Sequence, residues 1–176
     1  MHIIAKGSVM TVRHALLGSP LGPLTLSADS EGLRGIYFAG HRHPPRQDSL
    51  GEQVQVAVDP LLSQVAGQLA EYFDHARTSF DLPLTPVGPA FHQRVWDRLR
   101  AIDYGERMTY GAIATELGDP RLARAVGAAV GRNPISIVVP CHRVVGSTGR
   151  LTGFAGGLDR KAWLLALEGA GEPALF

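Results

Sequence analysis

The sequence predicts an α+β protein, with a small N-terminal antiparallel sheet under a covering helix and a mostly helical C-terminal part that contains a helix-turn-helix. Three observations support this prediction. β-rich segments separated by turn residues occur near the N-terminus. Apolar residues recur at helical spacing from Pro60 onward, and two short helical segments meet at a tight turn at Gly118.

The first part of the chain, residues 1–85, is predicted to be one α/β domain. Its sheet comes from three β-rich segments bounded by turn residues, 12–17, 24–28 and 33–38. Residues 39–58 are polar and rich in Pro and Gly, so we expect a loop. The apolar repeat over 60–73 predicts the covering helix. Residues 1–9 precede a second methionine and are interpreted as an extension outside the fold.

The second part, residues 86–176, is predicted to be a mostly helical domain. An apolar face over 91–102 predicts its first helix. Residues 135–139 are β-rich and apolar, which predicts a buried strand leading to Cys141. A last helix over 159–167 should stop at a glycine.

The predicted helix pair lies in the middle of this domain. Thr109 is a candidate N-cap for a helix that runs to about Leu117, because its hydroxyl can accept from a free backbone N–H. A second helix is expected over 121–130. Helix pairs of this kind also occur in ordinary bundles, so the pattern by itself does not indicate DNA binding.

The second helix of the pair carries two stripes. The core stripe contains Leu122, Val126 and Ala129, and the outer stripe contains Arg121, Arg124 and Ala128. Small residues leave its outer faces little bulk besides the arginines, so the helix could approach a nucleic-acid groove closely. Tight packing against a neighbouring helix explains Gly127 and Ala129 equally well.

Charge is uneven along the chain. The net charge is +1, but residues 120–158 contain five arginines and no acidic residue. An acid-free stretch of this kind favours an anionic partner, although chance clustering on a solvated face explains it as well. No apolar run is long enough to cross a bilayer.

The chain has one cysteine, so an internal disulfide is impossible and a reducing compartment is expected. One cysteine and seven scattered histidines do not favour a structural zinc site. His41 and His43 could share a metal ion, but a solvated loop before two prolines is the favoured interpretation. No metal and no cofactor is therefore predicted.

Cys141 lies between a proline and His142, with Arg143 following. A cationic setting lowers the pKa of a thiol and raises the fraction of thiolate, which is the nucleophilic form. A lone cysteine is also commonly a small buried apolar residue, so these features leave both interpretations open.

The segment over 133–146, NPISIVVPCHRVVG, resembles the active-site signature of the O6-alkylguanine–DNA alkyltransferases. Further segments resemble other motifs of that family, so the likeness spans nearly all of 12–169; they are 19–24, 104–106, 109–111, 123–127, 153–157 and 164–169. The resemblance implies a ribonuclease H-like N-terminal domain and a C-terminal domain that binds DNA and accepts the alkyl group.

Catalytic roles follow from the resemblance by position. Cys141 would accept the alkyl group, with His142 as its base through a bridging water. Glu168 would orient His142, as a carboxylate does in a triad. Asn133 would hold the active-site turn, and the hydroxyl of Tyr110 would assist guanine as it leaves.

The resemblance also implies how substrate is held. Arg124 would fill the gap left in the duplex when the nucleotide swings out. The other implied DNA contacts are Thr109, Tyr110, Arg121, Ala123, Ala125 and Ala128. The implied pocket residues are Met108, Val144, Ser147, Phe154 and Ala155. Phe154 stands where some members of the family have tyrosine, so a hydroxyl contribution is absent there.

The function implied is repair of O6-alkylguanine, and of O4-alkylthymine, in double-stranded DNA by irreversible transfer of the alkyl group to Cys141. The resemblance implies one turnover per molecule, binding through the minor groove, a monomer and a cytoplasmic location. Three alternatives remain at this point: a sensor that binds alkylated DNA without repair, a cysteine hydrolase, and a plain helix-turn-helix regulator.

Overall fold

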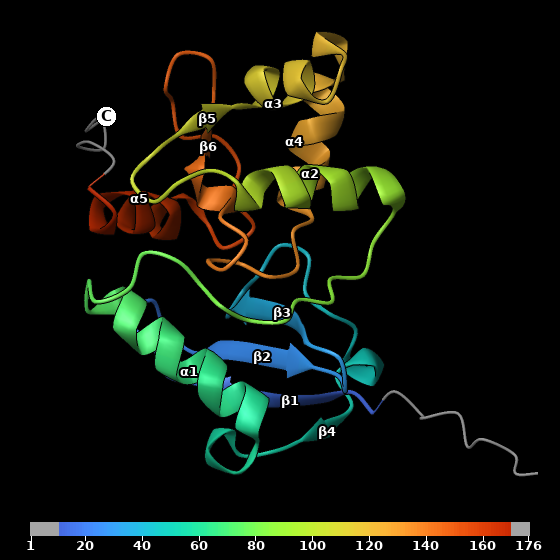
Figure 1. The fold of residues 1–176 in the computed structure, drawn as a ribbon, viewed down its shortest axis with the longest axis vertical. Coiled ribbons are helices and arrows are strands. Elements are labelled where there is room, and N and C mark those ends of the chain that lie inside the picture. The colour runs from blue at the N-terminus through green and yellow to red at the C-terminus, as the bar shows by residue number, and fades with distance from the viewer. Residues whose placement is uncertain (1–10, 170–176) are drawn as a thin grey trace, which may run out of the picture.

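The computed structural model describes residues 11–169 and confirms the α+β class. The sheet and helix α1 (Pro60–Phe73) form one half of the molecule, and the remaining helices gather on the side of strand β3 (Figure 1). The predicted extension at residues 1–9 lies outside the described residues. The division into two domains at residue 85 stays a prediction.

The sheet has the strand order β3-β2-β1-β4. Strands β1 (Arg13–Leu17), β2 (Leu24–Ala28) and β3 (Leu33–Phe38) match the predicted segments and pair antiparallel. The three predicted strands are antiparallel as expected, but the predicted loop over 39–58 contains a fourth strand, β4 (Glu52–Gln53), which pairs parallel with β1 and makes the sheet mixed. Two exposed polar residues carry no apolar alternation, so the sequence pattern could not reveal this strand.

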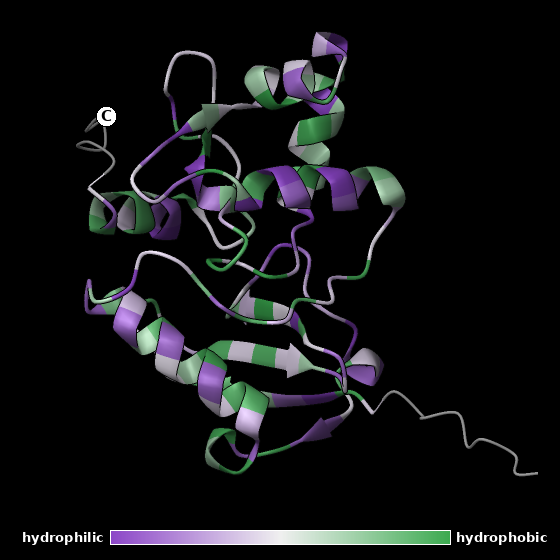
Figure 2. Ribbon diagram, in the orientation of Figure 1, coloured by the Kyte–Doolittle hydropathy of each residue, from purple (hydrophilic) through white to green (hydrophobic). Residues whose placement is uncertain are grey.

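Helix α1 confirms the predicted covering helix. The carboxylate of Asp59 accepts from the Leu62 backbone N–H at 2.9 Å, and Pro60 occupies the first turn, where its missing N–H costs nothing. The buried face contains Leu62, Val65, Leu69 and Tyr72. Hydrophobic and hydrophilic residues alternate around α1 accordingly (Figure 2).

Within the described residues, the α-helices of the other half are α2 (Ala90–Arg100), α3 (Tyr110–Glu116), α4 (Ala123–Gly131) and α5 (Leu158–Leu167). The Thr109 hydroxyl accepts from the Ala112 N–H at 3.1 Å, which confirms the predicted cap of α3. A short 3-10 turn over Pro120–Leu122 precedes α4, so the α-helix begins two residues later than predicted.

The two predicted stripes are confirmed within α4, whereas Arg121 and the partly buried Leu122 lie in the 3-10 turn before it. Val126 and Ala129 are fully buried, whereas Arg124 is exposed. The Trp96 indole N–H donates to the Ala129 carbonyl at 2.8 Å, which holds α2 against α4.

The free edge of β3 is covered by two segments from farther along the chain. Leu33 donates to the Pro83 carbonyl at 2.8 Å, and Ile36 donates to the Pro134 carbonyl at 2.9 Å. The chain just before Cys141 is therefore hydrogen-bonded to the N-terminal sheet. Covering an edge in this way also blocks it from pairing with other chains.

The predicted strand over 135–139 is wrong, although its residues are buried. Only a single bridge forms, between Ile135 and Ile36. Ile137 then adopts a φ of 72°, in the left-handed region that a β-branched residue rarely enters. This turn ends the strand pairing at once.

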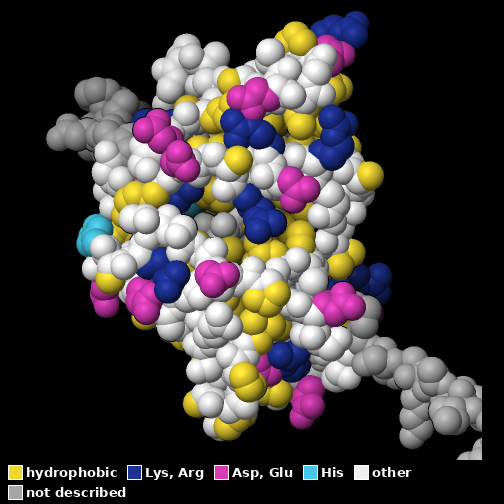
Figure 3. All heavy atoms as spheres, in the orientation of Figure 1, with side chains coloured by type: hydrophobic (Ala, Val, Ile, Leu, Met, Phe, Trp, Pro, Cys, Tyr) yellow, Lys and Arg dark blue, Asp and Glu magenta, His cyan; other side chains and the backbone are white. Residues whose placement is uncertain are grey.

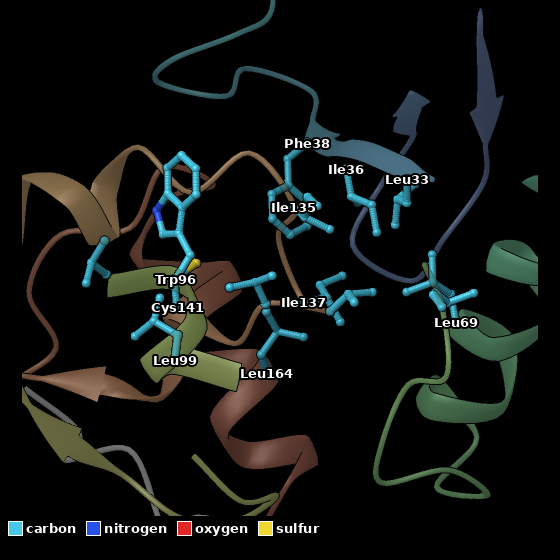
Figure 4. Close-up of a cluster of buried hydrophobic side chains, with 14 of the residues drawn as sticks. Leu33, Ile36, Phe38, Leu69, Trp96, Leu99, Ile135, Ile137, Cys141 and Leu164 are labelled. Carbon is cyan, nitrogen blue, oxygen red and sulfur yellow. The ribbon is translucent and has the colours of Figure 1, made fainter. Parts of the chain in front are cut away.

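One continuous apolar core links both halves of the molecule. Side chains from β3 and α1 face those from α2 and α5, with Cys141 among them (Figure 4). Acidic and basic side chains are mixed over the face seen in Figure 3. None of the helices formed by residues 11–169 has the length and apolar character needed to span a bilayer.

Candidate functional site

Cys141 opens a short 3-10 helix over Cys141–Arg143, directly after the turn at Ile137. Asn133 holds this turn: its amide donates to the Val139 carbonyl at 2.8 Å, and its side-chain oxygen accepts from the Ile135 N–H at 3.0 Å. A β-branched residue in the left-handed region costs about 1–3 kcal/mol, which persists only where the surroundings fix the backbone. The cysteine is thus held by a constrained turn.

The thiol of Cys141 is almost fully buried, yet it lines a cavity of about 210 Å³. The wall of this cavity comes from α3, α4, the 152–155 loop and one loop of the N-terminal half. Besides Cys141, the cavity is lined by Arg42, His43, Tyr110, Gly127, Val130, Gly131, Thr152, Gly153, Phe154 and Ala155. A larger cavity of about 400 Å³ lies between α2 and the linker before it, but Cys141 does not line that cavity. The smaller cavity is therefore the candidate substrate pocket.

His142 and Glu168 form a fully buried pair behind the cysteine. The Nε2 of His142 lies 2.8 Å from a carboxylate oxygen of Glu168, and Nδ1 has no hydrogen-bond partner among the described residues. Burial lowers the pKa of His142; the Glu168 carboxylate raises it, and the charges of Arg143 and Lys161 lower it, so that the net pKa is below the ordinary value. A neutral ring that donates from Nε2 leaves Nδ1 free to accept a proton.

Glu168 is held as a carboxylate at the end of α5. Burial alone would raise its pKa, but hydrogen bonds from His142 and Arg143 outweigh that effect and keep the pKa well below its usual range. Arg143 makes a two-point contact, with Nε at 2.9 Å and Nη2 at 2.8 Å. This ionised group can orient the His142 ring and stabilise it when protonated.

The prediction that His142 and Arg143 lower the pKa of the thiol is wrong. Burial is the largest influence and raises the pKa of Cys141, while a hydrogen bond from Asn133 and the charge of Lys161 lower it. Arg143 is paired with Glu168, and burial disfavours the charged form of His142, so neither side chain supplies the expected positive field. The buried thiol therefore depends on a base to take its proton.

Lys161 on α5 is a buried residue next to the site that the sequence prediction missed. Its ammonium group is fully buried and donates to the carbonyls of Val144, Thr152 and Gly153 at 2.5, 2.9 and 3.2 Å. Burial lowers the pKa of Lys161 to about 8. Its position three and four residues before the buried Leu164 and Leu165 was the available signal, because these positions share one helix face.

Tyr72 is a second residue that the prediction missed. Its hydroxyl reaches from α1 and donates to Glu168 at 2.7 Å. Position 72 lies on the buried stripe of α1, but the sequence does not show that a hydroxyl there meets a carboxylate 96 residues away. The N-terminal half thus contributes directly to the polar network behind Cys141.

We expect Tyr72→Phe to lower the free energy of unfolding by about 1.5–3 kcal/mol, the range for a hydrogen bond to a charged group. Urea unfolding checks this value. Tyr37→Phe is the matched control, because Tyr37 lies on β3, where its ring packs edge-on against His41, and is not among the residues that hydrogen-bond Glu168. Equal losses in both variants would contradict the role given to Tyr72.

The structure places the implied DNA contacts on the α3–turn–α4 segment. Arg124, Ala125 and Ala128 are exposed, and Ala123 is partly buried. Thr109 is occupied as the cap of α3, and Arg121 forms an exposed ion pair with Asp119 at 2.9 Å, so both have structural roles as well.

Of the implied pocket residues, some line the cavity and others lie outside it. Phe154 and Ala155 line the cavity, as does Tyr110, whose hydroxyl donates to the Thr152 carbonyl at 3.0 Å. Met108 and Val144 pair with each other through the short strands β5 (Met108–Thr109) and β6 (Val144–Val145), outside the cavity lining. Ser147 is exposed and does not line the cavity either.

His41 and His43 do not form a metal site with a third ligand; residues 11–169 contain no group of three potential ligands. The His41 ring is buried and stacks on Phe38 at 6.2 Å, and within the described residues neither ring nitrogen has a partner. Burial lowers its pKa to about 4, with smaller contributions from His43 and Arg160.

We expect His41→Phe to remove part of the acid sensitivity of folding. The unfolded chain binds a proton at His41 near the ordinary pKa of about 6.5, but the folded chain binds it only near 4, so stability is lost as the pH is lowered across that interval. Thermal unfolding at several pH values checks this expectation. A pH dependence identical to that of the unaltered chain would contradict it.

The fold and the site together define a class of protein: an α+β chain in which a constrained turn presents a thiol to a small pocket, with a His–Glu pair behind it and a helix pair beside it. Two family models match the chain, "6-O-methylguanine DNA methyltransferase, ribonuclease-like domain" over residues 12–86 and "6-O-methylguanine DNA methyltransferase, DNA binding domain" over residues 90–170. The chain therefore belongs to the 6-O-methylguanine DNA methyltransferase family.

Known relatives agree. A methylated-DNA–protein-cysteine methyltransferase of Methanosarcina acetivorans is 45% identical over 158 residues, which is 89% of this chain and 98% of the relative. One from Mycolicibacterium paratuberculosis is 42% identical, covering 93% and 96%. The crystal structure of the Mycobacterium tuberculosis O6-methylguanine methyltransferase superposes with a TM-score of 0.81 at 42% identity, covering 93% and 96%. The M. tuberculosis OGT structure in complex with DNA has a TM-score of 0.79 at 42% identity, covering 92% and 96%.

Proposed function

We propose that the protein is a methylated-DNA–protein-cysteine methyltransferase that repairs O6-alkylguanine by taking the alkyl group onto Cys141. The observation that carries the proposal is the thiol itself, which lines a pocket beside Tyr110 and is backed by His142 and Glu168. The names of the relatives support the same reaction.

In the proposed step, the thiol proton passes through a water molecule to the Nδ1 of His142. The sulfur then attacks the alkyl carbon in line, so that an S–C bond forms as the C–O6 bond breaks. The leaving guanine takes up a proton through the Tyr110 hydroxyl, and the proton held on His142 restores the phenol through solvent. The Glu168 carboxylate stabilises the transient imidazolium.

The thioether that results has no evident route of hydrolysis, so each molecule reacts once. The target carbon is not reachable inside a stacked duplex, and we infer that the nucleotide is extruded into the pocket. O4-alkylthymine presents the same kind of ether carbon and is the second substrate we propose.

We infer that α3 and α4 act as a helix-turn-helix that enters the minor groove. The exposed face of α4 is made of Ala125 and Ala128 beside Arg124, so its backbone can approach the DNA closely. We further propose that the protein acts as a monomer in the cytoplasm, where its thiol stays reduced.

Arg124→Ala should slow transfer from alkylated duplex DNA more than transfer from free O6-benzylguanine. The arginine is exposed on α4, away from the cavity lining, and only a duplex has a gap to fill. We expect a loss of about tenfold or more on the duplex, as for about 1.4 kcal/mol of lost interaction. Single-turnover rates on both substrates check this, and equal losses would remove the role.

Stoichiometry tests the proposed function. Excess duplex containing O6-methylguanine is incubated with the protein, and repaired guanine is counted against protein. We expect a plateau at one equivalent. Product that continues to accumulate would indicate a hydrolase, and binding without any product would indicate a damage sensor.

A further inference from the structure

The N-terminal half contributes a wall of the Cys141 cavity. Arg42 and His43, in the loop between β3 and β4, line the cavity together with Cys141 and Tyr110. Arg42 is exposed at its mouth and His43 is partly buried. None of the roles implied by the sequence involves this loop.

The loop is fixed against the pocket. The Arg42 N–H donates to the Ala155 carbonyl at 2.8 Å. The Arg160 guanidinium donates to the carbonyls of Ala39 and Gly156, both at 3.0 Å, and so bridges the loop to the opposite wall. The rings of Phe38 and Phe154 pack 5.8 Å apart beneath it. The Arg42 side chain is therefore presented from a position set by hydrogen bonds.

Positive charge converges at this mouth. Arg42 lines the cavity, and Arg132 is exposed directly after Gly131, which also lines it. Burial lowers the pKa of His43, and the positive charges of Arg132 and Arg42 lower it further. Neither Arg42 nor Arg132 forms an ion pair with another described residue. In contrast, Arg46 in the same loop pairs with Asp48 at 2.9 Å. Like charges placed together without an acidic partner are typical of a site for an anion.

We propose that Arg42 of the N-terminal half and Arg132 after α4 form a clamp for a DNA phosphate next to the extruded nucleotide. This inference rests on the proposed function. A base inserted beside Cys141 must leave its sugar and flanking phosphates outside the cavity. Arg42 lines the cavity at this side, and the exposed Arg132 directly follows Gly131, another lining residue. Arginine can bind a phosphate through two parallel N–H donors, which fixes orientation as well as affinity.

The clamp is tested by replacing the two phosphates that flank O6-methylguanine, one at a time, with neutral methylphosphonates. The transfer rate is measured below saturating DNA for the unaltered chain, Arg42→Ala, Arg132→Ala and the control Arg46→Ala. Anisotropy with the same duplexes measures binding independently of transfer.

At one of the two positions, we expect the neutral methylphosphonate to slow alkyl transfer by the unaltered chain about tenfold. This factor corresponds to the loss of about 1.4 kcal/mol of charge-assisted hydrogen bonding. Arg42→Ala should be slower by a similar factor on ordinary DNA and show little further loss on the methylphosphonate. The dependence of its log affinity on log salt should become shallower by about 0.9. Arg46→Ala should behave as the unaltered chain.

The proposal is overturned if methylphosphonates at both positions slow Arg42→Ala and Arg132→Ala as much as the unaltered chain. It is also overturned if Arg46→Ala reproduces the loss of Arg42→Ala. Absence of any transfer by the unaltered chain would contradict the proposed function instead, and the anisotropy measurements would still decide the clamp.

Discussion

Cys141→Ala is expected to abolish alkyl transfer completely while leaving DNA binding and the fold in place. Cys141 is the only cysteine of the chain, so no other thiol can take its place. Its side chain is buried and packs in the core, but alanine removes a single sulfur atom and should cost the fold little. Transfer is measured by intact mass after incubation with alkylated duplex, and binding by anisotropy.

Cys141→Ser complements this experiment, because serine has the same side-chain shape with oxygen in place of sulfur but is a far weaker nucleophile. Both variants should bind duplex containing O6-methylguanine as tightly as the unaltered chain. Residual transfer in either variant would show that another atom accepts the alkyl group. Loss of binding and transfer together would indicate that the sulfur serves the fold instead of the chemistry.

Glu168→Gln should have the second largest effect, lowering both the stability of the fold and the rate of alkyl transfer. The carboxylate accepts hydrogen bonds from Tyr72, His142 and Arg143, and it is buried with them. Removing one partner of a buried ion pair leaves the guanidinium of Arg143 without its counter-charge, which typically costs about 3–5 kcal/mol of stability. The rate of transfer should fall at least tenfold, because the His142 imidazolium loses the negative charge that stabilises it.

Two measurements separate these effects. Urea unfolding gives the change in stability, and single-turnover transfer at a temperature where the variant remains folded gives the rate. Glu31→Gln is the control, because Glu31 is exposed in the turn after β2. A transfer rate for Glu168→Gln equal to that of the control would contradict the role given to the His–Glu pair.

The contribution of Glu168 to stability should also depend on pH. The folded pKa of Glu168 lies well below its ordinary value, so its contribution to stability is present at neutral pH and is lost as pH falls below about 4.5. That part of the acid sensitivity should be missing in Glu168→Gln.

The sequence predicted most elements where local patterns were strong. The β2, β3 and α1 bounds matched, because turn residues and a helical apolar repeat marked their ends. The cap of α3 was found from one hydroxyl, Thr109, since capping is a local interaction. The order of Cys141, His142 and Glu168 was recognised from resemblance, not from spacing.

What the sequence missed depends on contacts between distant residues. Strand β4 is only two residues long and exists because an edge of β1 was free. Ile137 adopts a left-handed conformation that no apolar pattern indicates. Tyr72, Lys161 and Arg42 reach the site from other elements. In the sequence alone, each of them resembles an ordinary helix or loop residue.

The most direct test of the account is peptide mass mapping after the unaltered protein meets duplex DNA containing O6-methylguanine. We expect the peptide that contains Cys141, and no other peptide, to gain the mass of one methylene as a methyl group replaces the thiol hydrogen. A Cys141 peptide of unchanged mass after the lesion has been consumed, or a methyl group found on another residue, would contradict the account.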